Sequence, residues 1–384
     1  MSYSGTFIAA EECIGTLLSG AEVLDVRSPS EHHFASIPGM VLGPIMDDAE
    51  RHEVGICFQH DGQSAAIELG HRLVAGEVRE SRVRFWIDQI KNRPISLVCC
   101  ARGGLRSQIA QQWLAESGVS LPRVRGGYKA LRNVLIESAD AALTQLPTVV
   151  VAGKTGSGKT ELLRASSLRP SALDLEQLAD HCGSAFGALY GAQPSQSTFE
   201  NRVCMELIRI ERSRAWMLVE DESSHVGKVR LVPQLTKRIG SSPIVVVECP
   251  FDERVERILN LYVAAYPIDE AAANPVSQLE TYLLGSLQKI SERLGGARAK
   301  ECGALIEAAL QEQRNGRGAE LHRNWIAYLL REYYDPMYDR ALERRSAAVL
   351  FSGPMEDVVE RLHYMLHLDP QPLSSLGAFE RAFE

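Results

Sequence analysis

One stretch of eight residues constrains the fold of this chain more than any other feature. Residues Gly153–Thr160 read Gly-Lys-Thr-Gly-Ser-Gly-Lys-Thr and fit the pattern G-x-x-x-x-G-K-[ST]. The apolar run Thr148–Ala152 before them predicts a buried strand, and a helix is expected after them. A glycine-rich loop between a strand and a helix surrounds phosphates with backbone N–H groups. This phosphate loop therefore predicts an α/β domain that binds a diphosphate or a triphosphate.

Individual residues of the phosphate loop have separate expected roles. The backbone amides expected to surround the phosphates are those of Gly153, Gly156, Ser157 and Gly158. Lys159 is expected to reach the terminal phosphate, and Thr160 can hold a Mg²⁺ ion. Apart from such a Mg²⁺, the sequence predicts no metal site and no tightly bound cofactor. The pattern leaves open which phosphate compound binds and whether it is hydrolysed.

A short acidic run lies at the end of another predicted strand of this domain. The strand is expected over Ala215–Val219, and the acidic residues 220–222 follow it directly. Asp221 and Glu222 are candidates for an acidic contact to a metal ion or a water molecule beside the phosphates. A solvated strand end fits the same spacing equally well.

A second glycine-containing loop lies in the N-terminal part of the chain. Ile95–Cys99 reads as a strand, and residues 100–107 lead from it into a helix pattern with the sequence Cys-Ala-Arg-Gly-Gly-Leu-Arg-Ser. The two glycines let successive N–H groups point inward as an anion nest, and the helix adds its partial positive charge. Cys100 at the mouth of this cysteine loop is expected to react as a thiolate. Arg102 and Arg106 can add charge or bind an oxyanion.

Two chemistries fit the cysteine loop. Cys100 and Arg106 have the spacing of the phosphate cradle in cysteine phosphatases. A carrier of sulfur or selenium needs the same thiolate, but it holds a persulfide or selenenyl group instead of a phosphoryl group. The neighbouring Cys99 ends the strand and is expected to pack into the sheet as a structural residue.

Strands that alternate with helices predict an α/β fold with mostly parallel sheets. The two glycine-containing loops begin about 50 residues apart, each after its own strand, so two α/β domains are expected. The predicted boundaries are residues 1–143 and 144–384. The second domain is expected to end in a helical C-terminal extension that starts near Asp252.

Composition and charge exclude several classes of protein. The 384 residues contain no run of about 18 apolar residues, so no membrane span is predicted. Residues 1–10 lack a basic segment followed by an apolar one, which indicates a cytoplasmic protein. The eight cysteines lack CxxC or zinc-type spacing and read as reduced thiols. The net charge of −8 argues against a protein that coats nucleic acid nonspecifically, and no DNA partner is expected.

The N-terminal part resembles a rhodanese domain. The resemblance rests on the run Leu24–Glu31, which reads Leu-Asp-Val-Arg-Ser-Pro-Ser-Glu, then on Ile37-Pro38-Gly39, and then on the cysteine loop. This order of motifs favours a sulfur or selenium carrier over a phosphatase. The resemblance implies a rhodanese-like domain followed by a P-loop NTPase-like domain.

A rhodanese-like domain joined to a phosphate-loop domain resembles the tRNA 2-selenouridine synthase family over most of the chain. The further stretches that carry this resemblance are Gly126–Arg132, Leu173–Glu176, His181, Gly183–Gly187, Gln193–Gln196, Phe199–Asn201, Val219–Ser223 and Tyr333–Pro336. A phosphate loop alone is weak evidence for one family, whereas this ordered series is strong.

The resemblance implies an enzyme that replaces sulfur by selenium at C2 of the wobble 2-thiouridine, position 34, in certain tRNAs. It implies selenophosphate as the selenium donor and an S-geranylated uridine made from geranyl diphosphate. A thioamide sulfur is a poor leaving group, and alkylation turns it into a thiol leaving group. The phosphate loop suits the diphosphate of the alkyl donor, and Cys100 suits the carrying of selenium. A selenophosphate-producing enzyme is a candidate partner besides tRNA.

A basic window marks a candidate RNA-facing surface. Residues 201–240 hold eight Lys and Arg against five acids, a local charge of +3 in a chain of −8. The candidate tRNA contacts are Arg202, Arg209, Lys228, Arg230, Lys237 and Arg238. An ordinary solvated helix surface fits the same composition equally well.

Two interpretations without RNA remain open from the residues alone. One is a rhodanese-type sulfurtransferase fused to a nucleotide-dependent kinase or ATPase. The other is a noncatalytic module that senses phosphorylated ligands through both loops. Binding of tRNA would separate the family's activity from both.

Overall fold

The computed structural model describes residues 5–189, 191–213, 216–267, 275–345 and 347–366. The chain divides into two compact units, one formed by residues 1–144 with 195–209 and the other by residues 145–194 with 210–384. The chain first passes from one unit to the other after residue 144, one residue from the expected domain boundary. Residues 195–209 were expected in the second domain, but they group with the first unit.

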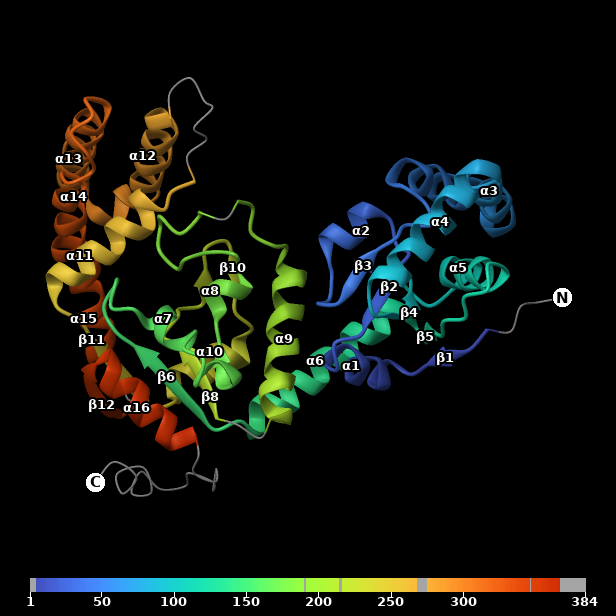
Figure 1. Cartoon of the computed structure of the whole chain (residues 1–384), viewed down its shortest axis with the longest axis horizontal. Coiled ribbons are helices and arrows are strands. Elements are labelled where there is room, and N and C mark those ends of the chain that lie inside the picture. The colour runs from blue at the N-terminus through green and yellow to red at the C-terminus, as the bar shows by residue number, and fades with distance from the viewer. Residues whose placement is uncertain (1–4, 190, 214–215, 268–274, 346, 367–384) are drawn as a thin grey trace. The chain divides into compact units, whose positions relative to one another are not determined.

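The first unit is built around a five-stranded parallel sheet with the order β1-β5-β4-β2-β3 (Figure 1). Its strands are β1 (Phe7–Ile8), β2 (Glu22–Asp25), β3 (Met40–Leu42), β4 (Ile95–Cys99) and β5 (Arg123–Val124). Strand β4 is apolar except at Ser96, the middle of β2 is Val23-Leu24, and Val23, Leu24 and Val98 are fully buried. Such continuous apolar strands are typical of parallel sheets that helices cover on both faces.

The first unit also contains helices, of which α4 and α5 contact β4. The helices are α1 (Ala10–Leu18), α2 (Pro29–Phe34), α3 (Asp48–Leu73), α4 (Gly76–Asn92), α5 (Leu105–Glu116), α6 (Gly127–Gln145) and α9 (Gln196–Arg212). Trp86 of α4 and Trp113 of α5 stack with ring centroids 6.1 Å apart. Both rings belong to the core cluster that includes Val98 of β4 and Cys100. The cysteine loop therefore begins at a strand end that is packed into the hydrophobic core.

The second unit holds another five-stranded parallel sheet, with the order β12-β11-β6-β8-β7. Its strands are β6 (Thr148–Ala152), β7 (Ala172–Leu173), β8 (Met217–Glu220), β11 (Ile244–Glu248) and β12 (Val349–Pro354), and β9 (His225–Val226) pairs with β10 (Val229–Arg230) in a separate antiparallel ribbon. The predicted strand over 148–152 is confirmed, and the one predicted over 215–219 is β8, while Ala215 lies outside the described residues. The chain runs from central β6 to β7 on one side of it and later from β8 to β11 on the other. Open α/β sheets bind ligands at the carboxyl ends of the strands where the strand order reverses in this way.

The C-terminal part of this unit is mainly helical, as predicted, but it is not an extension beyond the sheet. The helices of the unit are α7 (Lys159–Leu163), α8 (Leu175–Leu178), α10 (Pro233–Ser241), α11 (Phe251–Leu259), α12 (Pro275–Leu294), α13 (Gly296–Arg314), α14 (His322–Leu329), α15 (Asp335–Glu343) and α16 (Met355–Leu366). A 3₁₀ turn, η1 (Arg169–Ser171), and two π-helical segments, η2 (Asn260–Ala264) and η3 (Leu330–Tyr334), complete them. The strand β12 was not predicted, and it returns the chain to the sheet by pairing in parallel with β11.

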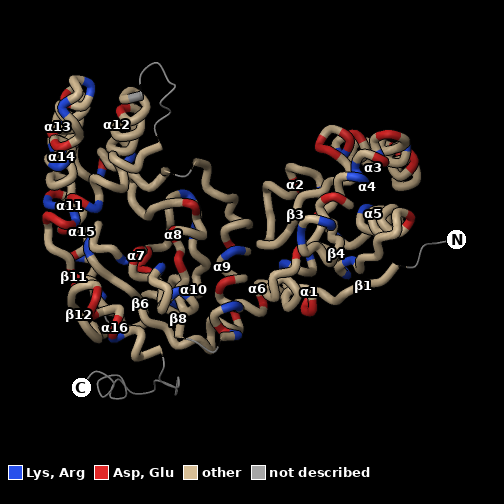
Figure 2. Tube along the Cα trace, viewed as in Figure 1, with Lys and Arg blue, Asp and Glu red and all other residues tan. Residues whose placement is uncertain are grey.

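The fold thus confirms a mixed α/β architecture with parallel sheets. Within the described ranges, none of the helices has the length and apolar character needed to cross a membrane. Figure 2 shows acidic and basic residues interspersed along the helices of both units.

Candidate functional site

Cys100 is the first residue after β4, and α5 begins at Leu105. The cysteine is buried, with 3% of its surface exposed, and its Sγ lies 3.2 Å from Oγ of Ser107. This hydroxyl also donates to the carbonyl oxygen of Gly104 at 3.1 Å. A hydroxyl can rotate, so Ser107 can donate to the sulfur once the thiol has lost its proton. Ser107 has no role predicted from the sequence, although its place in the first turn of the helix after the cysteine is a usable signal.

The N-terminus of α6 closes the cysteine loop from the other side. The amide of Tyr128 donates to the carbonyl of Cys100 at 2.8 Å, and that of Lys129 donates to the carbonyl of Ala101 at 3.0 Å. Gly127 has φ +62°, and a Cβ on it would lie 2.2 Å from the Cys100 oxygen, so no side chain fits there. Within the described part of the chain, the amides of residues 101–104 donate to no other backbone group. They remain available to an anion, as the predicted nest requires.

The two arginines of the cysteine loop differ in their surroundings. Arg106 donates to both carboxylate oxygens of Glu31, at 2.5 and 3.1 Å. Burial alone would raise the pKa of Glu31, but Arg106 outweighs burial and lowers that pKa. Arg102 is exposed and forms no ion pair with any residue in the described ranges. Of the two, Arg102 is therefore the side chain with free donors for an oxyanion.

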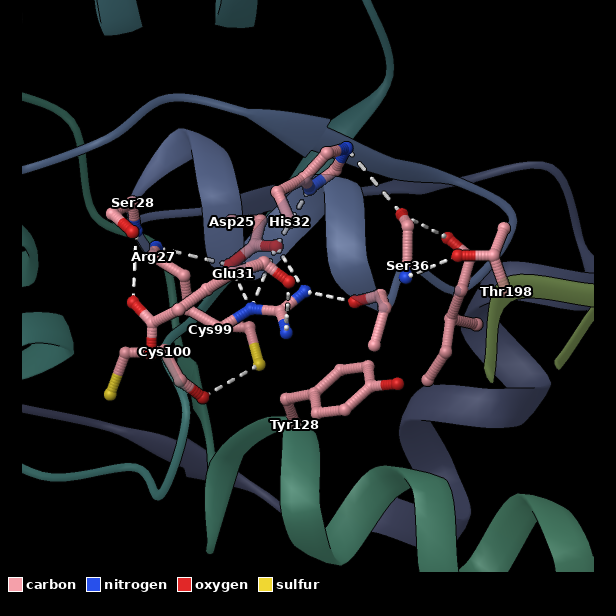
Figure 3. A network of polar contacts seen from close by, with 12 residues as sticks. Asp25, Arg27, Ser28, Glu31, His32, Ser36, Cys99, Cys100, Tyr128 and Thr198 are labelled. Atoms are coloured by element: carbon pink, nitrogen blue, oxygen red, sulfur yellow. Dashed lines mark hydrogen bonds and ion pairs between the residues drawn. The ribbon is translucent and has the colours of Figure 1, made fainter. Parts of the chain in front are cut away.

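A buried polar network lies directly behind the cysteine loop (Figure 3). Asp25 ends β2, is fully buried, and accepts from Nη2 of Arg27 at 2.6 Å and from Nδ1 of His32 at 2.9 Å. Burial would raise the pKa of Asp25, but hydrogen bonds from these two partners lower it. The Arg27 guanidinium stands 4.0 Å from the ring centre of Tyr128, whose hydroxyl lies 3.0 Å from the amide nitrogen of Asn201. The network thus fixes the helix start that closes the cysteine loop.

Cys99 is a structural residue, as predicted. It is fully buried at the end of β4, and burial raises its pKa well above the ordinary value for a thiol. Its Sγ–H donates to the neighbouring carbonyl of Cys100 at 3.3 Å. Cys99 is thus a thiol that stays protonated.

In the second unit the phosphate loop lies between β6 and α7, as the sequence predicts. Nζ of Lys159 donates to the carbonyl of Gly153 at 2.7 Å, which folds the lysine over the loop. A Cβ on Gly153 would lie 2.5 Å from Oγ of Ser157 and 2.7 Å from the carbonyl of Val247, so only glycine fits. Gly158 takes a left-handed conformation, with φ +92°, directly before the helix.

Two arginines of α11 hold the phosphate loop by its carbonyl groups. Nε of Arg254 donates to the carbonyl of Thr155, and Nη1 of Arg257 donates to that of Gly156, both at 3.1 Å. Arg254 is buried and also bonds both carboxylate oxygens of Asp335, at 3.1 and 2.7 Å. Neither arginine was singled out from the sequence, but Asp335 lies in the quoted stretch Tyr333–Pro336. The arginines bind two carbonyls of the loop, and the amides of Gly156 and Gly158 donate to no other backbone group among the described residues, so they are available to phosphate oxygens. The predicted amide of Ser157 is not available in this state, because it donates to the carbonyl of Lys154 at 3.0 Å.

A cluster of three carboxylates lies beside Thr160. The threonine hydroxyl donates to Oε2 of Glu176 at 3.0 Å. Glu176, Glu220 and Glu222 each place an oxygen within 4.8 Å of the others. Glu220 is 1% exposed, and its two oxygens have no hydrogen-bond partner among the described residues. Burial and the charge of neighbouring carboxylates raise the pKa of all three, that of Glu222 to about 7.

The members of this acidic cluster differ from the residues predicted for the acidic contact. Glu222 belongs to it, as predicted, but Asp221 does not, because its carboxylate is paired with Arg345. Side chains alternate in direction along an extended chain, so residues 220 and 222 face the cluster while 221 points away. Carboxylate and hydroxyl oxygens are the donors that Mg²⁺ prefers, and unpaired buried carboxylates need a cation or protons. The residues beside Thr160 therefore fit the expected Mg²⁺.

The six candidate tRNA contacts do not lie in one compact unit. Arg202 and Arg209 belong to the part of α9 that groups with the first unit, whereas the other four belong to the second. Arg209 forms an ion pair with Glu206 at 2.7 Å. Nε of Arg230 donates to His225 at 2.9 Å. The other contacts predicted in the second unit are Lys228, Lys237 and Arg238.

Comparisons with known proteins agree over both units. A family model described as the tRNA 2-selenouridine synthase AAA domain matches residues 146–368. A tRNA 2-selenouridine synthase from Cupriavidus necator is 46% identical over 351 residues, which cover 90% of this chain and 95% of the relative. Proteins of the same name from Hahella chejuensis and Pseudomonas fluorescens are each 44% identical. The matches cover 89% and 90% of this chain, and 91% and 95% of those relatives.

Proposed function

Because this chain belongs to the tRNA 2-selenouridine synthase family, a family of enzymes, we propose that it exchanges sulfur for selenium in the wobble 2-thiouridine of tRNA. The reaction proceeds in two steps, S-geranylation with geranyl diphosphate and then selenation with selenophosphate. The second unit holds the diphosphate, and the rhodanese-like first unit supplies the cysteine.

In the first step the 2-thio sulfur attacks C1 of geranyl diphosphate. The C–O bond breaks, its electron pair leaves with the diphosphate, and N3 of the uridine loses its proton. The phosphate loop and Lys159 hold the charge of the departing diphosphate. A Mg²⁺ held by Thr160 and the acidic cluster would neutralise part of that charge.

In the second step Cys100 carries the selenium. Its thiolate attacks the selenium of selenophosphate, and the P–Se electron pair stays on phosphorus, which leaves phosphite and an enzyme perselenide. The terminal selenium adds to C2 of the base, and geranyl thiolate leaves with the C–S electron pair. A reducing thiol then attacks the Cys100 sulfur, so that the S–Se electron pair stays on the base as 2-selenouridine. A second equivalent of thiol reduces the resulting disulfide.

The observation that carries this proposal is the position of the Cys100 thiol. It lies 3.2 Å from the Ser107 hydroxyl, in a loop whose amides are free for the oxyanion of a donor. Exposed Arg102 can bind the same phosphorus oxygens. The arrangement supplies both the nucleophile and the binding groups for selenophosphate.

The test is an incubation with thiolated tRNA, geranyl diphosphate, selenophosphate and a thiol, followed by mass analysis of the nucleosides. Cys100→Ser should abolish 2-selenouridine and leave S-geranyl-2-thiouridine to accumulate. Cys57→Ser, at a partly exposed cysteine of α3 in the same unit, is the matched control and should keep full yield. An unchanged selenouridine yield in Cys100→Ser would exclude the carrier role.

The phosphate loop is tested by its lysine. Lys159→Ala should lower geranylation first, by about 10²-fold or more, because the departing charge loses its closest cation. Selenation of tRNA that is already geranylated should be nearly unchanged. Turnover of ATP that tRNA does not affect, with no modified nucleoside, would favour a nucleotide-dependent enzyme instead.

A further inference from the structure

The segment that carries the cysteine loop is strongly basic, and the proposed reaction uses only part of this charge. Residues 99–136 contain six Lys and Arg against one acid, a local charge of +5 in a chain of −8. This exceeds the +3 of the basic window at residues 201–240. The one acid, Glu116, ends α5, roughly 16 Å along the helix from its start at the loop, and pairs with Arg79. It therefore does not neutralise the cations near the cysteine loop.

The topology of the first sheet brings three of these cations to one edge. Strands β4 and β5 pair in parallel, so the segments that follow their carboxyl ends meet at the same edge. The segment after β4 contains Arg102, and the segment after β5 contains Arg125 and Lys129. The amide of Lys129 donates to the carbonyl of Ala101 at 3.0 Å, directly beside Arg102. Arg102, Arg125 and Lys129 together are called the basic rim of the cysteine loop.

The charges of the basic rim are available to a ligand. All three side chains are exposed, and none of them pairs with an acidic group in the part of the chain that the structure describes. Two other cations of the segment, Arg106 and Arg132, are each paired with a glutamate. The guanidinium of Arg125 lies 5.5 Å from the ring centre of Phe7, a contact that orients it and leaves its N–H groups for an anion.

The selenium donor alone does not account for the basic rim. The amides of the cysteine loop and Arg102 already supply binding groups for the phosphorus oxygens of selenophosphate. Arg125 and Lys129 follow the neighbouring strand, so they extend the positive charge beyond the loop. Neighbouring cations on a surface suit a phosphodiester chain, which carries one negative charge on every nucleotide. The nucleotide that takes the selenium must bring C2 of its base to Cys100, and its own phosphates then lie near the rim.

We propose that the basic rim binds the RNA backbone beside the nucleotide that reacts at Cys100, and that Arg125 and Lys129 contact its phosphates. The inference rests on the proposed reaction and adds an RNA-binding surface in the first unit, outside the basic window at residues 201–240. Phosphate contacts position an RNA and carry no sequence information of their own. The rim therefore holds the backbone whatever the sequence of the tRNA.

The test is the fluorescence anisotropy of labelled tRNA with wobble 2-thiouridine, titrated with protein at several salt concentrations from about 50 to 200 mM. Each phosphate contact to a single-stranded loop contributes about 0.7 to the slope of log affinity against log salt. Arg125→Gln and Lys129→Gln should each lower that slope by about 0.7 and weaken tRNA binding about fivefold at 0.1 M salt. Lys129→Glu should weaken it further, because the reversed charge repels the phosphates.

Lys91→Gln is the matched control for the loss of a positive charge. Lys91 is an exposed lysine of the same unit near the end of α4, which leads into the amino end of β4 and thus the opposite edge of the sheet. The control should keep both the affinity and the slope of wild type. Lys237→Gln tests the basic window in the same assay. A slope that Lys237→Gln lowers and the rim variants leave unchanged would overturn the proposal.

Loading of Cys100 separates RNA binding from donor binding. With selenophosphate and no tRNA, Arg125→Gln and Lys129→Gln should carry as much cysteine-bound selenium as wild type, measured by mass spectrometry of the protein. Reduced loading would assign both cations to the donor and overturn the proposal. Unchanged salt slopes in the rim variants, with 2-selenouridine still formed, would sink the rim but keep the reaction. Weakened tRNA binding in the rim variants, with no 2-selenouridine made by wild type, would sink the reaction but keep the RNA surface.

Discussion

Glu220→Gln is expected to stabilise the second unit when no divalent cation is present. Glu220 is buried, its oxygens lack hydrogen-bond partners among the described residues, and two other carboxylates lie within 4.8 Å. At that separation two charges repel by roughly 1–3 kcal/mol for an effective dielectric constant between bulk water and a protein surface. Glutamine keeps the shape of the side chain and removes this repulsion. The free energy of unfolding at pH 8 should rise by about 1–3 kcal/mol.

The effect should depend on pH in a defined direction. The pKa of each clustered carboxyl is raised in the folded protein, to about 7 for Glu222. The folded state therefore binds more protons than the unfolded state above pH 4.5 or so, and stability falls as the pH rises through this window. The stability gained from this extra proton binding is fully present below the pKa that the carboxyls have in the unfolded chain. The gain from Glu220→Gln should accordingly be largest near pH 8 and nearly vanish near pH 5.

Calorimetric melting in a chelator measures this gain, at about 2–4 °C for each kcal/mol in a unit of this size. Added Mg²⁺ should stabilise the wild type more than the variant. Glu307→Gln, at an exposed position of α13, is the control and should change stability by less than about 0.5 kcal/mol. A lower melting temperature for Glu220→Gln in chelator at pH 8 would show that the carboxylate is stabilising, and the repulsion argument would be refuted.

Three further substitutions test the supports of the two loops. Gly127→Ala should abolish selenation and destabilise the protein by about 2 kcal/mol or more, since its Cβ would meet the carbonyl of Cys100. Gly118 has open space around it, so Gly118→Ala should cost about 1 kcal/mol in denaturant unfolding and keep activity. Asp335→Asn should raise KM for the diphosphate donor severalfold, because Arg254 loses the carboxylate that holds it under the phosphate loop, and an unchanged KM would contradict this role. Glu31→Gln should cost about 1–2 kcal/mol in urea unfolding, since it removes the carboxylate that pairs with half-buried Arg106 and part of a helix cap. A neutral result would show that these contacts contribute little.

The positions of the cysteine loop and the phosphate loop could be predicted because their signals are local. The glycine spacing of the phosphate loop, the cysteine at the end of a strand and the helix after each loop all lie within about a dozen residues. The partners of these loops are distant in sequence. Thr160 bonds a carboxylate 16 residues away, and Arg254 bonds one 81 residues away. Periodicity in a single sequence carries no information about such pairings.

The structure differs from the predictions at β12 and at the acidic cluster, for different physical reasons. The strand β12 lies at the edge of its sheet. Its sequence Val-Leu-Phe-Ser-Gly-Pro is neither alternating nor continuously apolar, so it lacks both patterns that predict a strand. Glu220, rather than Asp221, could be predicted to share the acidic cluster with Glu222, because side chains alternate along an extended chain and residues 220 and 222 therefore lie on one face. The acidic cluster could therefore be predicted more fully from the sequence, whereas β12 could not.

The assignment of residues 195–209 to the first unit limits how this protein can be cut or recombined. The chain crosses between the units after residues 144, 194 and 209. A gene truncated after codon 144 would encode a first unit without Asn201, whose amide bonds the carbonyl of Ser36 and the hydroxyl of Tyr128. A chimera that exchanges the cysteine-bearing unit must include residues 195–209, or the Ser36 carbonyl and the Tyr128 hydroxyl will lose these hydrogen bonds.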